Sequence, residues 1–158
     1  QHLAVGKRLS LINNANKKYP GESTQALING IGGTVDYKNP SWQGFEAEDL
    51  IATIDLGNIQ RINSIKTRFL QSQVFWIFLP KKIQIEHSID GKNFELLYET
   101  SPGNDFSFVQ DIFTYSVEPD NMESRFIRLK ALNIDQCPKY HPGAGRPSWI
   151  FSDEIIIN

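Results

Sequence analysis

Three segments of this chain bring aromatic residues together with hydrogen-bonding ones. They hold Tyr37, Trp42 and Phe45 in the first, Gln71, Gln73, Phe75 and Trp76 in the second, and Tyr140, His141 and Trp149 in the third. An aromatic ring offers a flat apolar face, and neighbouring polar groups supply directional hydrogen bonds. The combination suits a ligand that is polar at its rim but carries flat patches of C–H, as a sugar does. Tyr140 and His141 are the best candidates for an exposed pair.

Each of these candidates also has a plain structural interpretation. Trp42 and Trp149 are more typical of packing, the second because an apolar strand follows it. Trp76 stands at a loop-to-strand junction, where a binding platform and a packing role are equally expected. His141 is expected to form loop hydrogen bonds rather than to bind a metal, since no second His or Cys stands at a metal-ligand spacing.

The sequence carries no motif of a common enzyme class: G-x-S-x-G, H-E-x-x-H, a Walker loop and G-x-G-x-x-G are all absent. Glu46, Glu48 and Asp49 could be imagined as a glycosidase pair, but that mechanism needs carboxylates facing each other across a cleft. They fit a solvated turn before a strand better. Cys137, the only cysteine, cannot form an internal disulfide and is expected to be a small buried residue. We predict that this fragment is not an enzyme.

The composition fits one globular domain, which we predict to span residues 1–158. The chain has 158 residues, of which 40 % are hydrophobic and 11 % aromatic, too many for a disordered segment. Sixteen Lys and Arg against 18 Asp and Glu give a net charge of −2, so no basic field is available for nucleic acid. The longest apolar runs are far shorter than a bilayer span.

The spacing of apolar residues predicts an all-β fold. Seven strand-like runs, each bounded by Gly, Pro, Asn or Asp, cover residues 50–56, 62–70, 82–89, 94–100, 106–117, 125–134 and 149–157. Ile83, Ile85, His87 and Ile89 alternate with polar residues, which predicts one buried face. Asp90-Gly91 between two runs predicts a hairpin. Residues 13–49 and 135–148 resist the pattern and are expected to be long functional loops.

Several motifs, in register along the chain, resemble the coagulation-factor-5/8 type C (discoidin-like) domain and, within it, the family 32 carbohydrate-binding modules. They are Ala26-Leu27-Ile28-Asn29-Gly30, Trp42-Gln43-Gly44-Phe45, Ile54-Asp55-Leu56-Gly57, Ser88-Ile89-Asp90-Gly91-Lys92-Asn93-Phe94, Arg125-Phe126-Ile127-Arg128-Leu129 and Asp153-Glu154-Ile155. The resemblance implies a jelly-roll β-sandwich of the galactose-binding-domain-like type. It also implies ligand loops at one end and sugar binding rather than bond cleavage.

Two further stretches are similar to the C-terminal module of bacterial family 20 β-N-acetylhexosaminidases (chitobiases). They are Phe69-Leu70-Gln71 with Trp76-Ile77-Phe78-Leu79-Pro80, and Cys137-Pro138 followed by His141-Pro142-Gly143-Ala144-Gly145. The resemblance implies a fragment of a larger glycoside hydrolase, with that enzyme's catalytic domain as a partner. It further implies a bacterial periplasmic or extracellular setting.

The family commonly binds a structural calcium, and its pattern maps onto six residues here. These are Ala26 and Ile31 through backbone carbonyls, Asn29 and Thr34 through side-chain oxygens, the Asp153 carbonyl and the Glu154 carboxylate. Calcium takes six to eight oxygens, and Gly30, Gly32 and Gly33 would let the loop curve around it. The position of Asn29 is commonly Asp, so Glu154 is the only mapped carboxylate. The alternatives are an Asn-Gly turn and a solvated Glu154.

The resemblance also maps the ligand contacts onto the loops, at Arg68, Gln71, Gln73, Trp76, Tyr140 and His141. The predicted function is a non-catalytic module that tethers an attached β-N-acetylhexosaminidase to glycans with GlcNAc, GalNAc or galactose-type termini. The alternative is a purely structural domain that packs on the catalytic domain and binds no sugar. Membrane adhesion ranks third, because Val74, Phe75 and Trp76 lack a ring of basic residues.

Overall fold

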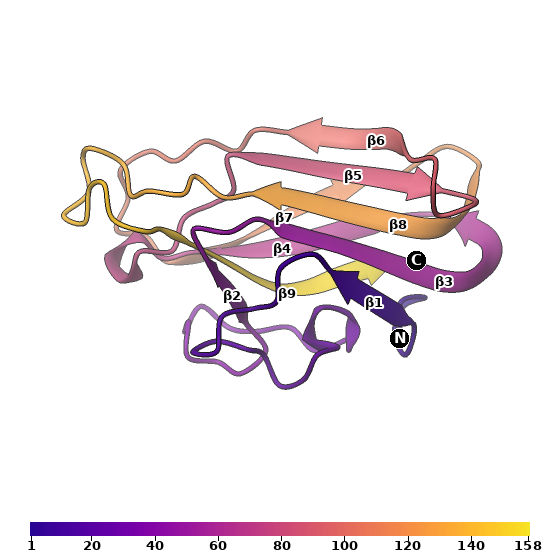
Figure 1. Ribbon diagram of the computed structural model, residues 1–158, viewed down its shortest axis with the longest axis horizontal. Coiled ribbons are helices and arrows are strands. Elements are labelled where there is room, and N and C mark those ends of the chain that lie inside the picture. The colour runs from indigo at the N-terminus through magenta and orange to yellow at the C-terminus, as the bar shows by residue number, and fades with distance from the viewer.

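The computed structural model describes all residues from 1 to 158, and nine strands form two antiparallel sheets that pack face to face (Figure 1). The strands are β1 (Arg8–Leu11), β2 (Gln43–Glu46), β3 (Leu50–Ile62), β4 (Ile65–Gln71), β5 (Lys82–Ser88), β6 (Glu95–Thr100), β7 (Asp111–Val117), β8 (Met122–Leu132) and β9 (Trp149–Ile157). One sheet has the order β1-β3-β8-β5-β6 and the other β2-β9-β4-β7. The predicted all-β sandwich is confirmed.

Two single-turn 3-10 helices complete the structure, η1 (Ala26–Ile28) and η2 (Gln73–Phe75). Each has three residues, so neither could cross a membrane. The long first loop, residues 12–42, runs beneath the smaller sheet and carries η1 (Figure 1). The ends of the chain lie together, since the Leu3 N–H donates to the Ile157 carbonyl at 2.7 Å.

The core lies between the two sheets. Twenty buried apolar residues form one cluster, among them Leu50, Phe69, Ile83 and Ile155. In β5 the buried side chains of Ile83 and Ile85 alternate with partly exposed ones, as the period-two pattern predicts, but further along the strand Ser88 is buried in place of His87. Strand β9 is buried almost throughout because it is central in its sheet and the first loop passes over it.

Several predicted boundaries were wrong. The sequence pattern did not predict strands β1 and β2. Strand β1 lies in no predicted run, and strand β2 lies inside the expected loop 13–49. The run predicted over 106–117 begins only at Asp111, because its partner β4 ends at Gln71, the last residue paired with β7. Residues 106–110 therefore have no strand beside them and form a loop. Ile89, predicted to be buried, is 59 % exposed beyond the end of β5.

The predicted hairpin at Asp90-Gly91 is present between β5 and β6. Only Gly91 adopts a positive φ, of 74°. Asp90 instead accepts hydrogen bonds from the N–H groups of Lys92 and Asn93, at 2.9 and 2.8 Å, so its side chain closes the turn.

Candidate functional site

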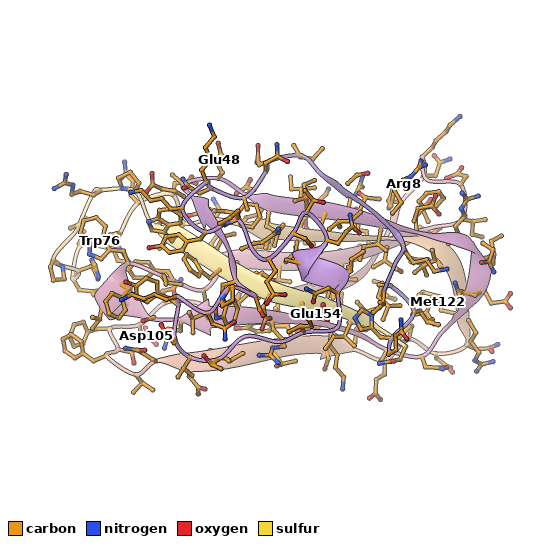
Figure 2. The ribbon with its side chains drawn as sticks, turned by 90° about the horizontal axis from the view of Figure 1, so that it is seen from below. Arg8, Glu48, Trp76, Asp105, Met122 and Glu154 are labelled. Atoms are coloured by element: carbon orange, nitrogen blue, oxygen red, sulfur yellow. The ribbon has the colours of Figure 1, made fainter.

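Three loops meet at one end of the sandwich: the turn 72–77 between β4 and β5, residues 101–110 between β6 and β7, and residues 133–148 between β8 and β9. Figure 2 shows Trp76 and Asp105 at this end, opposite Arg8 and Met122. Reciprocal hydrogen bonds between Ser72 and Ile77, at 3.0 and 3.1 Å, close the turn. Trp76 follows η2 with a φ of 67°. This left-handed conformation is rare for a bulky residue, so the surrounding loops must hold it in place.

Gln73 joins the three loops through its own polar atoms and is only 3 % exposed. Its Nε2 donates to the Asp105 carbonyl at 2.7 Å. Its Oε1 accepts from the Tyr140 hydroxyl at 3.1 Å and from the Ser107 N–H at 3.4 Å. A residue predicted to contact ligand therefore has its side-chain amide engaged within the protein.

His141 is held in the same way. Its Nδ1 accepts the Gly143 N–H at 3.0 Å, so the proton lies on Nε2, which donates to the Gln73 carbonyl at 2.7 Å. The ring is 7 % exposed and packs edge to face with Trp76 and Phe78, with centroids 5.8 and 5.1 Å away. Because both ring nitrogens are used, His141 positions the loop, as its interpretation as a loop hydrogen-bonder predicts.

A cleft of about 260 Å³ opens between these loops, and we call it the first cleft. It is lined by Gln73, Val74, Trp76, Phe106, Ser107, Phe108, His141 and Pro142. Phe106 packs edge to face against Phe108 at 4.6 Å and against Tyr140 at 5.7 Å between ring centroids. Phe106 and Phe108 are 55 % and 68 % exposed, so apolar ring surface faces solvent here. Such rings stacked beside polar groups form a surface on which a sugar can pack.

The remaining predicted ligand contacts lie elsewhere. The Arg68 guanidinium donates to the Gly33 carbonyl at 3.1 Å and pairs with Asp153 at 3.0 Å, beneath the first loop. Gln71 is 8 % exposed and its Nε2 lies 3.4 Å from the Val109 carbonyl. Neither residue lines the first cleft. The structure thus brings Gln73, Trp76, Tyr140 and His141 together, and it separates the other two from them.

Sequence reasoning missed Phe106 and Phe108, which were assigned to a strand. Pro102-Gly103-Asn104-Asp105 directly precedes them and carries strong turn character. That signal could have placed the two rings on a loop. Trp42, in contrast, is 1 % exposed and donates to the Thr34 carbonyl at 2.8 Å, which confirms its packing role.

A family model for the F5/8 type C domain matches residues 12–149 of the sequence. The chain belongs to the F5/8 type C domain family. No curated protein matches the sequence.

Solved structures similar to this F5/8 type C domain include three modules from bacterial proteins. Chitosan-binding module 1 of a chitosanase/glucanase from Paenibacillus sp. IK-5 has a TM-score of 0.62 at 15 % identity, covering 100 % of this chain and 98 % of that one. A family 32 carbohydrate-binding module of Clostridium perfringens in complex with GalNAc-β-1,3-galactose has a TM-score of 0.58 at 17 % identity, and the match covers 99 % of each chain. A Streptococcus pneumoniae fucose binding module has a TM-score of 0.59 at 11 % identity, and the match covers 99 % of this chain and 94 % of that one. At these identities the likeness shows the fold.

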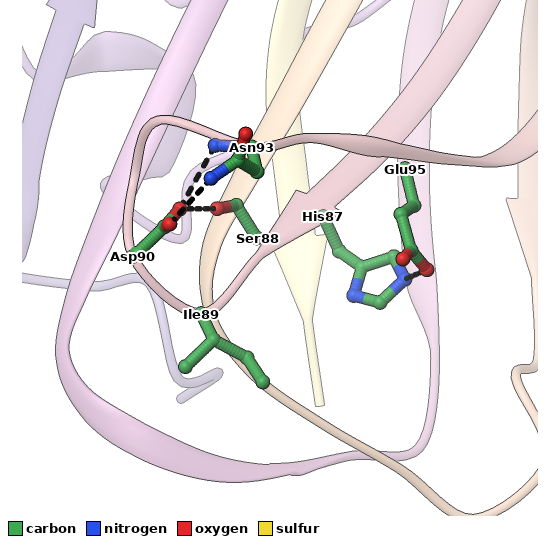
Figure 3. Close-up of a pocket in the computed structure, with 6 residues that line it drawn as sticks. All are labelled: His87, Ser88, Ile89, Asp90, Asn93 and Glu95. Atoms are coloured by element: carbon green, nitrogen blue, oxygen red, sulfur yellow. Dashed lines mark hydrogen bonds and ion pairs between the residues drawn. The ribbon is translucent and has the colours of Figure 1, made fainter.

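A shallow concavity of this F5/8 type C domain lies beside the hairpin turn between β5 and β6, away from the first cleft (Figure 3). Its polar groups are engaged with one another: Asp90 accepts from Ser88 and from Asn93, while His87 lies 3.8 Å from Glu95. Hydrogen bonds from the backbone N–H groups of Asn93 and Lys92, together with these two side-chain hydrogen bonds, lower the pKa of Asp90 below its usual range. The concavity is the outer surface of the hairpin turn and presents one apolar residue, Ile89.

Part of the predicted calcium set converges where the first loop crosses β9, near Glu154 in Figure 2. The Glu154 Oε1 accepts the Gly30 N–H at 3.0 Å, and its Oε2 lies 3.0 Å from the His2 Nε2. The Asn29 Oδ1 accepts the Ile31 N–H at 2.8 Å. Burial raises the pKa of Glu154 to about 7 and lowers the pKa of His2, which shifts both groups towards their neutral forms.

Side chains of two further residues of the set also accept backbone N–H groups. The Thr34 hydroxyl accepts the Asp36 N–H at 3.3 Å, and the Asp153 Oδ2 accepts the Gly33 N–H at 2.6 Å. Ala26 is buried in η1. Calcium requires six to eight oxygens facing one point, whereas N–H donors face the Glu154 carboxylate. The predicted ligands at Ala26, Ile31 and Asp153 are backbone carbonyls, which these side-chain hydrogen bonds do not occupy, and calcium binding stays a prediction.

Proposed function

We propose that this F5/8 type C domain is a non-catalytic carbohydrate-binding module whose sugar site is the first cleft. The observation that carries the proposal is the group of aromatic rings at the loop end, Trp76, Phe106, Phe108 and Tyr140, set on loops that buried Gln73 and His141 hold in place. Rings held in advance cost little entropy when a sugar packs on them. The sugars bound by the chitosan-binding, GalNAc-β-1,3-galactose-binding and fucose-binding neighbours support the ligand class.

The resemblance to chitobiase modules supports a finer proposal. The module would tether a β-N-acetylhexosaminidase, carried on the same polypeptide in a bacterial periplasmic or extracellular setting, to glycans ending in GlcNAc, GalNAc or galactose. Binding at one site would be weak, because an open cleft buries little surface and the sugar must shed water. Tethering would act by raising the local concentration of substrate around the enzyme.

The test is a glycan array with GlcNAc, GalNAc and galactose termini, followed by titration calorimetry on the glycans that bind. Trp76→Ala and Phe106→Ala remove ring surface from the first cleft, and Ile89→Ala removes an exposed apolar side chain at the far end as a matched control. We expect each cleft variant to lose about 2- to 12-fold in affinity, the value of one aromatic contact, while the control binds as the unchanged protein does.

Two results would contradict the proposal. If the folded protein binds no glycan, the aromatic loop end serves another purpose, and the alternative of a structural domain packed on a catalytic domain becomes the better explanation. If glycans bind equally to all three variants, sugar binding is real but the site is elsewhere. Circular dichroism of each variant shows whether it is folded.

A further inference from the structure

Two adjacent aromatic residues in the turn 72–77 face two different clefts. Trp76 lines the first cleft, and Phe75 lines another of about 150 Å³, which we call the second cleft. The left-handed conformation of Trp76 explains the division, because it turns the chain between consecutive side chains. Consecutive Cα atoms are about 3.8 Å apart, so only the turn itself separates the two clefts.

More of the residues that line the second cleft are aromatic than of those that line the first. It is lined by Lys18, Tyr19, Tyr37, Glu46, Phe75, Ile77, Trp149 and Phe151. The Tyr37 ring lies 4.4 Å from the Phe75 ring at a tilt of 38°, which joins the first loop to the turn. Trp149 and Phe151, which are 9 % and 1 % exposed, form a fixed base, while Phe75 is 44 % exposed.

Two charged side chains border this aromatic surface without partners in the protein. Lys18 and Glu46 are both exposed, and neither side chain takes part in an ion pair or a hydrogen bond. A lysine donates and a carboxylate accepts, so together they can address hydroxyl groups from both sides. The second cleft therefore has both parts of a sugar site: Phe75 supplies exposed ring surface, and Lys18 and Glu46 supply free directional groups.

We propose that the second cleft is a second sugar subsite, and that the module binds linked sugars on both sides of the turn 72–77. The inference rests on the proposed function of the first cleft, since the occupant is the next part of the same glycan. Val74 and Phe75 form the ridge over which that glycan passes, and they are 49 % and 44 % exposed. The module would therefore prefer an oligosaccharide to the matching monosaccharide.

The experiment compares affinities for GlcNAc and its β-1,4-linked oligomers of two, three and four units, measured by titration calorimetry or by NMR. Tyr37→Ala removes the ring that packs on Phe75 but touches nothing in the first cleft. Glu46→Gln removes a charge at the rim and preserves the shape. Ile89→Ala at the far end is the control, and Trp76→Ala reports on the first cleft.

In the unchanged protein we expect affinity to rise by roughly 2- to 12-fold from the monosaccharide to the longest oligomer, the value of one aromatic contact. Tyr37→Ala should abolish this rise and leave monosaccharide affinity intact, and Glu46→Gln should reduce it. Trp76→Ala should weaken binding at every length. In an NMR titration, only the longer oligomers should shift the Tyr37 and Phe75 resonances.

Equal affinity at all lengths, with loss in Trp76→Ala, would overturn the second subsite while the proposed function stands. A rise with length that persists in folded Tyr37→Ala and Glu46→Gln would place the extra contacts elsewhere and overturn it as well. If no oligomer and no other arrayed glycan binds to the folded protein, the proposed function fails and takes the second subsite with it.

Discussion

Gly143→Ala is expected to displace Trp76 without straining the backbone. Gly143 does not have a positive φ, so alanine fits its conformation. A Cβ at this position would lie 2.8 Å from Cζ2, 2.9 Å from Cη2 and 3.0 Å from Cε2 of the Trp76 ring. Carbon atoms pack at about 3.5–4.0 Å, so the ring must shift by roughly 0.5–1 Å. That shift would change the shape of the first cleft.

The net cost in free energy of unfolding follows from two opposing effects. Overpacking costs about 1–3 kcal/mol. Replacing a glycine reduces the freedom of the unfolded chain and returns about 0.4–1 kcal/mol. Trp76 is partly exposed and can yield, so we expect the low end of the overpacking cost, which leaves a net loss of at most about 0.6 kcal/mol in a urea titration. The Trp76 indole N–H resonance should shift, and glycan affinity should fall.

Gly145→Ala, two residues along the same loop, is the matched control. Gly145 has a φ of 81°, and a Cβ there meets nothing within 4 Å. Alanine at this position costs about 1–2 kcal/mol through backbone strain alone. The Trp76 indole resonance should stay in place. If Gly143→Ala leaves the indole resonance and glycan affinity unchanged, Trp76 does not pack on Gly143, and the geometry of the first cleft is refuted.

Three further changes test other parts of the fold. Asn133 is 1 % exposed, donates to the carbonyls of residues 45 and 48, and accepts from the Ser148 hydroxyl. Asn133→Ala should therefore lower the free energy of unfolding by about 2–4 kcal/mol in a denaturant titration. A decrease under about 0.5 kcal/mol would show that water replaces these hydrogen bonds. The hydrogen bond from Arg125 lowers the pKa of Asp55 to about 2, below its unfolded value, so the stabilisation is present above about pH 4 and lost as the pH falls towards 2. In Asp55→Asn that part of the pH dependence should disappear, and identical pH curves for the two proteins would contradict the pair's contribution. Finally, calcium binding at the predicted set should raise the melting temperature when calcium is added, and EDTA should reverse that rise; an unchanged melting temperature would contradict calcium binding. His2→Ala, which removes the contact with Glu154, should lower the melting temperature with or without calcium.

The sandwich could be predicted because its strands are specified locally. In β5 and β8, apolar and polar residues alternate with period two over enough residues to exclude a helix. Strands β1 and β2 have four residues each, too few for the period to stand out. They exist because β3 and β9 offer them an edge to pair with, which is a property of the sheet rather than of the segment.

The start of β7 also depends on a partner strand rather than on its own residues. Phe106, Phe108 and Val109 favour strands by type, yet the strand begins at Asp111, opposite Gln71. Beyond Gln71 the partner chain turns into η2 and leaves nothing to pair with. Residues 106–110 are therefore a loop because of the turn 72–77, about 35 residues away in sequence. The same turn forms part of the first cleft.

Gln73 was expected to contact ligand and instead joins the loops, while His141 has the loop hydrogen-bonding role that was one of its two expected roles. Gln73 and His141 have the right chemistry to touch a sugar, but the same chemistry lets them bind the loops to each other, and burial favours that use because an unpaired polar group in a buried site is costly. The first cleft is lined by the rings of Trp76, Phe106 and Phe108 beside these engaged polar residues. The Arg146 guanidinium lies 6.0 Å from the centroid of the Trp76 ring. Selectivity among glycans should therefore depend on how the spacing of the rings matches the spacing of the sugar units. For this reason the number of sugar units in the glycan is the variable that tests the second cleft.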